Sequence, residues 1–212
     1  MNSKFKIIII CILVILILMF SMQFAYKKIK TGNNIYKSNE DFIDNIFNIS
    51  SYEANLEVTI NSNKTTNKYI IKQYYLEPNY FKQIIEFPEN IKNLETIYNG
   101  KELIIKNNNI NIQKIYKDFK YINNNRLFLN LFVDNCKGNG YRIFEDREEI
   151  NIKNNNNEIL YIKKSTKLPI KLEILDDNNN QRIYIEYKEI KINNIKDNNI
   201  FAFIIKEIKK EV

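Results

Sequence analysis

Side chains that could do chemistry are few in this sequence, and histidine is absent from it altogether. Without histidine, the chain cannot build Ser-His-Asp or Cys-His nucleophile systems, H-E-x-x-H sites or His-ligated zinc. Four glycines scattered through 212 residues leave no Gly-rich loop that could bind phosphate. We therefore expect no cofactor, no metal site and no catalytic residue.

The densest acidic stretch is Asp146-Arg147-Glu148-Glu149. Paired carboxylates can act as general acid and base when a cleft holds them about 5–10 Å apart. In a strand or a turn such residues more often face water, and we favour that interpretation here. The sequence thus indicates a protein that is not an enzyme.

A stretch of 20 residues without a charge, Ile7–Tyr26, follows a short basic start that contains Lys4 and Lys6. At about 1.5 Å rise per residue it spans the roughly 30 Å hydrocarbon core of a bilayer. A cleavable signal peptide is the alternative, but its apolar region is usually about 7–15 residues long. Residues 21–25 supply no clear A-x-A cleavage site. We expect a cytoplasmic stub at 1–6, then a transmembrane anchor or uncleaved signal at 7–26.

The two cysteines have simple interpretations. Cys11 follows Ile10, whereas a lipoprotein cysteine follows a small residue, and nine more apolar residues continue the span after it. Cys136 is the only cysteine outside the span, so no disulfide can form within the domain and we expect a buried free thiol.

Charge is distributed rather than clustered. The chain carries 32 Lys+Arg against 25 Asp+Glu, and 30 against 25 without Lys4 and Lys6. Lysines alternate with glutamates, which indicates solvated strand faces rather than the basic stripe of a nucleic-acid-binding protein. After a linker at 27–37, residues 38–212 are long enough for one domain of ordinary size.

The first half of the domain is mostly strand. A capping box at Ser38-Asn39-Glu40-Asp41 predicts a helix at about 39–48. From Tyr52 onward apolar residues occur at every second position, which predicts a strand, and a second strand runs back beside it through Tyr69 to Tyr75. Further strands are predicted at Tyr80–Phe87, Thr96–Tyr98, Glu102–Lys106 and Ile110–Tyr116, with Asn99-Gly100 as a two-residue turn.

The second half begins with a helix, since apolar residues recur at helical spacing within Arg126–Cys136. Strands then follow at Tyr141–Phe144, Glu149–Ile152, Glu158–Lys163, Pro169–Leu175 and Gln181–Glu189, and runs of asparagine mark the turns. The predicted fold class is α+β: a curled antiparallel β-sheet, as in a half-barrel, with two short helices on its concave face.

Two sets of residues form a recognisable series of turns and strand ends. In the C-terminal half they are the Leu168-Pro169 strand entry, the acidic turn Asp176-Asp177-Asn178, Tyr187, Ile192-Asn193 and Asp197 to Phe203. In the earlier half they are Pro78-Asn79-Tyr80-Phe81 and Tyr98-Asn99-Gly100-Lys101. Over roughly residues 50–205, this series resembles the LolA-like (outer-membrane lipoprotein carrier) superfamily. Within that superfamily, Phe81–Phe87 and Glu95–Asn107 are most similar to GerS-type spore germination lipoproteins. Those relatives carry a lipid-anchoring cysteine, whereas we expect this chain to use a membrane span instead.

The resemblance implies a membrane-anchored, non-catalytic protein of a spore former, with its C-terminal domain outside the cytoplasm in the cell or forespore membrane. The basic residues on the two sides of the span are nearly balanced, so this orientation rests on the short N-terminal flank and the resemblance. The implied partner is the spore-cortex N-acetylmuramoyl-L-alanine amidase, which takes part in making the muramic-δ-lactam that lytic enzymes recognise during germination. The alternative is a lipid or lipoprotein binder that uses an apolar concave pocket. A homodimer is a further possible assembly.

Two exposed segments are candidates for the partner interface. The first is the hairpin that contains Tyr98, Asn99 and Lys101, and the second is the acidic stretch with Asp146, Glu148 and Glu149. An exposed strand edge could bind a partner by strand addition, and aromatic side chains could be buried against it.

Overall fold

The computed structural model describes residues 43–120 and 125–201. Of these, residues 43–46 belong to one compact unit, and the described residues from Phe47 onward belong to another. Residues 43–47 are helical, in agreement with the helix predicted at about 39–48. The predicted anchor, the linker and the capping box lie outside the described residues. Among the described residues, no helix is long and apolar enough to cross a membrane.

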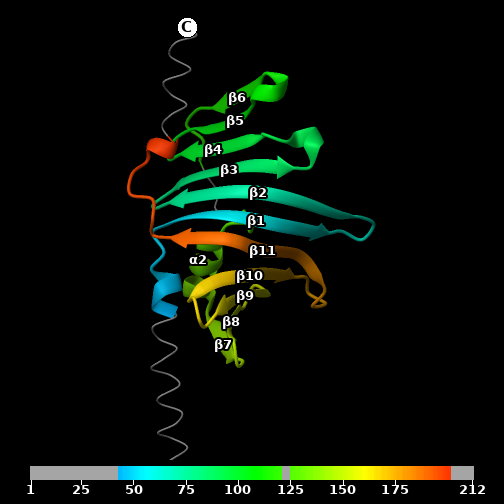
Figure 1. Cartoon of the computed structure of the whole chain (residues 1–212), viewed down its shortest axis with the longest axis vertical. Coiled ribbons are helices and arrows are strands. Elements are labelled where there is room, and N and C mark those ends of the chain that lie inside the picture. Colours follow the sequence, from blue (N-terminus) through cyan, green and yellow to red (C-terminus); the bar gives the residue numbers. More distant parts are fainter. Residues whose placement is uncertain (1–42, 121–124, 202–212) are drawn as a thin grey trace, which may run out of the picture. The chain divides into compact units, whose positions relative to one another are not determined.

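Eleven antiparallel strands among the described residues form one open, curled sheet (Figure 1). Their spatial order is β6-β5-β4-β3-β2-β1-β11-β10-β9-β8-β7. Their bounds are β1 Ser51–Asn61, β2 Thr66–Leu76, β3 Tyr80–Phe87, β4 Glu95–Asn99, β5 Leu103–Asn107, β6 Ile112–Tyr116, β7 Tyr141–Glu145, β8 Glu149–Asn154, β9 Glu158–Lys163, β10 Leu168–Leu175 and β11 Gln181–Ile192. The predicted antiparallel sheet is therefore confirmed.

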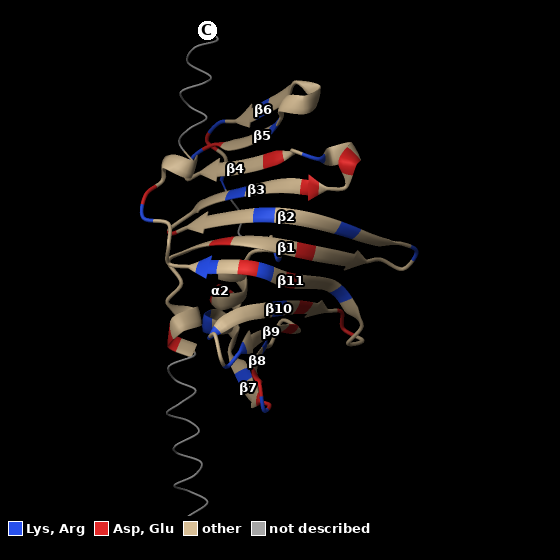
Figure 2. Cartoon of the chain, in the orientation of Figure 1, with Lys and Arg blue, Asp and Glu red and all other residues tan. Residues whose placement is uncertain are grey.

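Strand β1 lies at the centre of the sheet because it pairs with both β2 and β11. Tyr52 lies opposite Ile192, so the first and last strands are neighbours. Tyr52, Leu56 and Val58 on one face of β1 are buried, as the period of two predicted, while charged residues lie on the other face. Figure 2 shows acidic residues on β1, basic residues on β2 and both kinds on β11, so that opposite charges lie on neighbouring strands, as expected for a solvated face.

Asparagines form many of the turns, as their runs predicted. Asn157 lies in the β8–β9 turn, Asn179 in the β10–β11 turn and Asn111 ahead of β6, and each has a positive φ. Asparagine adopts this left-handed conformation more readily than most residues. A short 3-10 helix, η2 (Asn108–Ile110), precedes Asn111, and another, η1 (Glu89–Ile91), joins β3 to β4.

Helix α2 (Leu129–Asn139) covers one face of the sheet behind β1, β11 and β10 (Figure 1). It begins and ends three residues later than the predicted Arg126–Cys136. Residues 126–128 form a turn instead, in which Leu127 N–H donates to Asn125 Oδ1 at 3.2 Å. Gly138 lies inside the helix, and Gly140, with φ +82°, ends it.

Candidate functional site

Aromatic side chains fill the face of the sheet that α2 covers. Tyr52, Tyr75, Phe81 and Tyr98 lie opposite one another in register across β1 to β4, and we call them the aromatic row. All four are buried. Phe128, directly before α2, packs on Phe81 with ring centroids 5.3 Å apart. The row is therefore packed core at this place rather than the wall of an open pocket.

Polar atoms within this core hold the entry to α2. The Tyr52 hydroxyl donates to Gln73 Oε1 at 3.3 Å and accepts from Leu129 N–H at 3.1 Å. Gln73, which is fully buried, donates from Nε2 to the Leu127 carbonyl at 3.2 Å. Because buried polar groups require partners, these bonds fix the first turn of α2 against β1 and β2.

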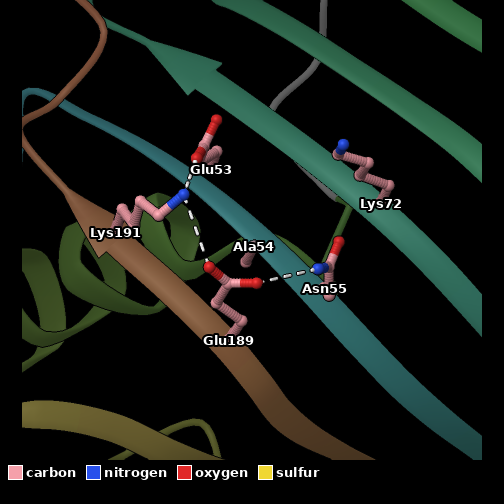
Figure 3. Close-up of a pocket in the computed structure, with 6 residues that line it drawn as sticks. All are labelled: Glu53, Ala54, Asn55, Lys72, Glu189 and Lys191. Carbon is pink, nitrogen blue, oxygen red and sulfur yellow. Dashed lines mark hydrogen bonds and ion pairs between the residues drawn. The ribbon is translucent and has the colours of Figure 1, made fainter.

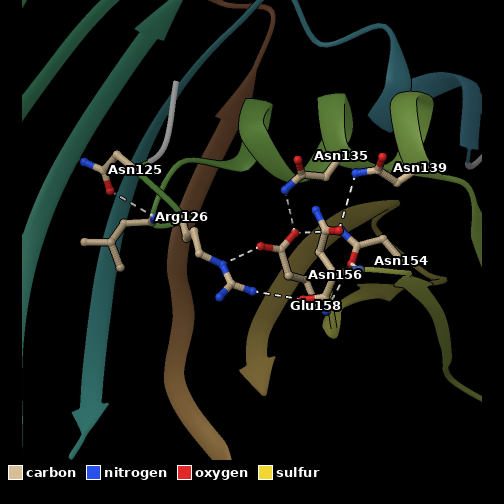
Figure 4. A network of polar contacts seen from close by, with 8 residues as sticks. Asn125, Arg126, Asn135, Asn139, Asn154, Asn156 and Glu158 are labelled. Atoms are coloured by element: carbon tan, nitrogen blue, oxygen red, sulfur yellow. Dashed lines mark hydrogen bonds and ion pairs between the residues drawn. The ribbon is translucent and has the colours of Figure 1, made fainter. Parts of the chain in front are cut away.

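A second polar network holds α2 to the β8–β9 turn (Figure 4). The Glu158 carboxylate, with a side chain only 2% exposed, accepts from Arg126 Nε at 2.8 Å. It also accepts from Asn135 Nδ2 at 3.1 Å and Asn154 Nδ2 at 2.6 Å. Arg126 donates further to the Asn156 carbonyl at 3.1 Å. Both carboxylate oxygens are engaged by donors, so this group suits a structural role rather than proton transfer.

Cys136, on α2 close to this network, is buried as predicted. Burial, and then the nearby Glu158 charge, raises the pKa of its thiol to about 12. The thiol is therefore protonated at neutral pH and is a poor nucleophile. Within residues 43–120 and 125–201, no group of three or more Cys, Asp or Glu side chains is placed to hold a metal ion.

A small polar pocket of about 70 Å³ opens on the other face of the sheet, beside a bulge at Asn55/Leu56 (Figure 3). Lys191 Nζ bonds Glu53 Oε1 at 2.8 Å and Glu189 Oε1 at 3.4 Å. The pocket is lined by Glu53, Ala54, Asn55, Lys72, Glu189 and Lys191. Since its acids and lysines largely neutralise one another and its volume is far below the ~300–1,000 Å³ of ligand pockets, it does not suit a lipid or cofactor.

The first predicted interface lies at the turn between β4 and β5. Tyr98 is buried, and its hydroxyl donates to the carbonyl oxygens of Gly100 and Phe119 at 3.0 and 3.2 Å. Lys101 is exposed, and its Nζ lies 3.5 Å from Asp118 Oδ1. Tyr98 thus stabilises the turn from inside, while Lys101 is available at the surface.

The turn itself differs in register from the prediction. Asn99 still belongs to β4, and its N–H donates to the Glu102 carbonyl at 3.3 Å. The two central residues are therefore Gly100 and Lys101 rather than Asn99 and Gly100. Gly100 has φ +88°, which glycine adopts without a steric penalty.

The second predicted interface is the exposed β7–β8 turn. Asp146 Oδ1 accepts from the Arg147 N–H at 2.6 Å, and the Asp146 N–H donates to the Glu149 carbonyl at 3.0 Å. Asp146 and Glu148 face water, and Glu149 is half-buried. Six strands separate β4 from β8 in the sheet order, so the structure does not bring the two predicted interfaces together.

Exposed apolar side chains gather on the two outermost strands, which sequence reasoning did not single out. On and before β6 they are Ile110, Ile112 and Tyr116, and on β7 they are Tyr141 and Phe144. Each of these strands has a paired neighbour on one side only within the described sheet. Unpaired strand edges with apolar side chains are surfaces that other chains can join.

Several solved structures are similar to the chain. An uncharacterized conserved protein from Thermus thermophilus is 13% identical, with 78% of this chain and 93% of that chain covered and a TM-score of 0.49. The CwlD amidase–GerS lipoprotein complex from Clostridioides difficile matches at 23% identity, 74% and 93% coverage and a TM-score of 0.44. The LolA superfamily protein NE2245 from Nitrosomonas europaea matches at 12% identity, 78% and 96% coverage and a TM-score of 0.39. A search of curated proteins finds no match.

The sporulation relatives that the sequence resemblance predicted are supported by a family model that matches the chain. That model, described as sporulation protein YdcC-like, matches residues 4–201. The match extends over nearly the whole chain, including all the described strands and α2. The chain therefore belongs to the YdcC-like sporulation protein family.

Proposed function

We propose that this protein is a membrane-anchored, extracytoplasmic and non-catalytic member of its family, which binds and activates a spore-cortex peptidoglycan amidase. The observation that carries the proposal is the open sheet, whose outermost strand β6 presents Ile112 and Tyr116 at 51% and 37% exposure. A surface of this kind supplies binding energy to a partner chain. The choice of an amidase follows the GerS-type resemblance of residues 81–107.

The inventory of reactive groups favours binding over chemistry. The whole chain lacks histidine, the Glu158 carboxylate is held by three donors, and burial raises the pKa of Cys136. The partner would therefore supply the catalytic zinc and its ligands. The contribution of this protein is to bind the active conformation of the amidase and raise its population. Moving an equilibrium from mostly inactive to mostly active takes about 5 kcal/mol of differential affinity.

The β6 edge and the adjoining β4–β5 turn form the interface that we favour. Lys114 lies between Ile112 and Tyr116 on the same face of β6, with its Nζ 4.8 Å from the Tyr116 ring centroid. If two copies of β6 paired antiparallel along their full length, the two Lys114 side chains would lie directly opposite each other. Like charges in that position destabilise a strand pair. The edge thus suits a different chain with an acidic residue opposite Lys114 better than it suits a second copy.

Complex formation tests this proposal. The full-length protein and its cognate amidase, purified separately, should co-elute in size-exclusion chromatography. Ile112→Lys should weaken binding by about 1–3 kcal/mol, because it replaces an apolar side chain at the proposed contact with a charge. Ile70→Lys, at an exposed isoleucine on β2, is the matched control and should leave binding unchanged. Equal binding by both variants would exclude the β6 edge.

A reporter fusion tests the orientation of the protein in the membrane. A reporter enzyme fused after Val212 should be active only outside the cytoplasm. Cytoplasmic activity of that fusion would reverse the proposed orientation.

The alternative function, lipid or lipoprotein binding, requires an apolar cavity on the concave face. The aromatic row and Phe128 pack against each other there, which speaks against such a cavity at this position. Organic-solvent extraction of the purified protein should therefore release no stoichiometric lipid from the domain. A bound lipid that survives detergent exchange would favour the carrier function instead.

A further inference from the structure

The chain contains two Asn-Gly pairs, Asn99-Gly100 and Asn139-Gly140. In such a pair the glycine N–H has no neighbouring Cβ to hinder it. It can therefore attack the asparagine side-chain carbonyl carbon in a spontaneous reaction. Because the two pairs share the same chemistry, any difference between them in the folded protein must come from the structure around each.

The Asn99 side chain lies in an arrangement that favours this attack. Its Oδ1 accepts from the backbone N–H groups of Lys101 at 3.1 Å and Glu102 at 2.8 Å. When the carbonyl carbon becomes tetrahedral, negative charge develops on this same oxygen, and two preorganised N–H donors stabilise it. The pair of donors acts as an oxyanion hole.

The other end of the amide faces a group that can move a proton. Asn99 Nδ2 lies 3.5 Å from Glu102 Oε2, and a carboxylate at that place can relay a proton to the departing nitrogen. Gly100 is exposed and has φ +88°. Among the described residues, its N–H has no hydrogen-bond acceptor in this turn.

Asn139-Gly140 differs at the attacking atom. The Gly140 N–H donates to the Cys136 carbonyl at 3.0 Å as the cap of α2. Attack would break this bond and open the end of the helix. Asn139 is also held by Asn155, which donates to its backbone carbonyl, and by Asn156, whose Oδ1 accepts from Asn139 Nδ2 at 3.4 Å.

We propose that Asn99 is a site of spontaneous deamidation in the folded protein, while Asn139 is protected. The Gly100 nitrogen loses its proton and bonds to Asn99 Cγ, the Cγ–Nδ2 bond breaks, and ammonia leaves. Water then opens the resulting succinimide to aspartate or isoaspartate. The product carries a new carboxylate beside Glu102 and no longer has the Nδ2 donor, so like charges meet in the turn. Deamidation therefore loosens the β4–β5 turn next to the β6 edge.

The test compares the two sites within one sample. The full-length protein is incubated in mildly alkaline buffer, either folded or unfolded in urea, and then digested with trypsin. Peptides Asn93–Lys101 and Gly138–Arg142 report the two sites separately, and fragment spectra assign the exchange of NH₂ for OH to Asn99 or Asn139. In the folded protein, Asn99 should react at least about tenfold faster than Asn139, a difference of about 1.4 kcal/mol in barrier. In urea, the two rates should be similar.

A folded-state rate ratio near that found in urea would overturn the proposal, as would faster reaction at Asn139. Glu102→Gln keeps the backbone N–H donors and removes the proton relay, so it should slow Asn99 by several-fold without changing Asn139. Unchanged Asn99 reactivity in this variant would remove Glu102 from the mechanism.

Discussion

Replacing Glu158 by glutamine tests how α2 is held on the sheet. The substitution keeps the size of the side chain, removes its charge and turns one acceptor oxygen into a donor. The three groups that donate to the carboxylate, from Arg126, Asn135 and Asn154, then compete for one remaining acceptor. At least one donor faces an NH₂ group in a site where Glu158 is 2% exposed.

The expected cost follows from this burial. Breaking a buried ion pair by removing one partner usually costs about 3–5 kcal/mol. Arg126 is 40% exposed and can regain water, so the lower end applies here, at about 3 kcal/mol. For a chain of this length, each kcal/mol lowers the melting temperature by about 2–4 °C, which gives a shift of about 6–12 °C.

Urea and thermal unfolding, followed by far-UV circular dichroism, measure the loss. Glu57→Gln is the matched control, since Glu57 pairs with Lys188 at 3.2 Å but is 54% exposed. Solvent-exposed ion pairs contribute little to stability, so this variant should change the free energy of unfolding by less than about 1 kcal/mol. If Glu158→Gln is no more destabilising than Glu57→Gln, the Glu158 network does not hold α2 on the sheet.

Three other predictions concern the interior. Tyr52→Phe removes the acceptor of the Leu129 N–H and should cost about 1–3 kcal/mol in urea unfolding; a neutral result would mean that water or another group replaces the hydroxyl. Cys136 should resist thiol reagents until the protein unfolds. Glu158→Gln removes a charge that raises the pKa of the Cys136 thiol, so this variant should be labelled faster at Cys136, as measured on the tryptic peptide that contains it. Burial also raises the pKa of Cys136 from 9.0 and of Tyr161 from 10.0, each to about 12. The neutral Cys136 and Tyr161 side chains therefore stabilise the fold fully below pH 9, and this stabilisation is lost as the pH rises toward 12. Urea midpoints should fall across that range, and midpoints that do not change with pH would contradict this prediction.

Local patterns in the sequence predicted most strands well. The alternation from Tyr52 onward corresponds to β1, and the predicted strands at Tyr80–Phe87 and Glu158–Lys163 match β3 and β9. These elements depend on a period of two that neighbouring residues reveal. The start of α2 was placed too early because Leu127 and Phe128 fit the helical period, although Asn125 bonds the Leu127 N–H and holds a turn there.

Features that depend on contacts between distant residues could not be predicted in the same way. The order of strands in the sheet decides that β6 and β7 are outermost, and no local signal distinguishes Ile112 from a core isoleucine. The partners of Glu158 come from three places in the chain. Glu158 was predicted only as the first residue of a strand, and its burial became evident from the fold.

Amidase activation is the most direct test of the proposed function. The purified protein, the cognate amidase and their mixture are each incubated with spore-cortex peptidoglycan, and the release of the peptide side chains is measured. We expect no hydrolysis by this protein alone and little by the amidase alone. The mixture should show a strong increase that Ile112→Lys reduces and Ile70→Lys does not. Hydrolysis by this protein alone would show that it is an enzyme, and an amidase whose activity does not change when the protein is added would exclude amidase activation as its function.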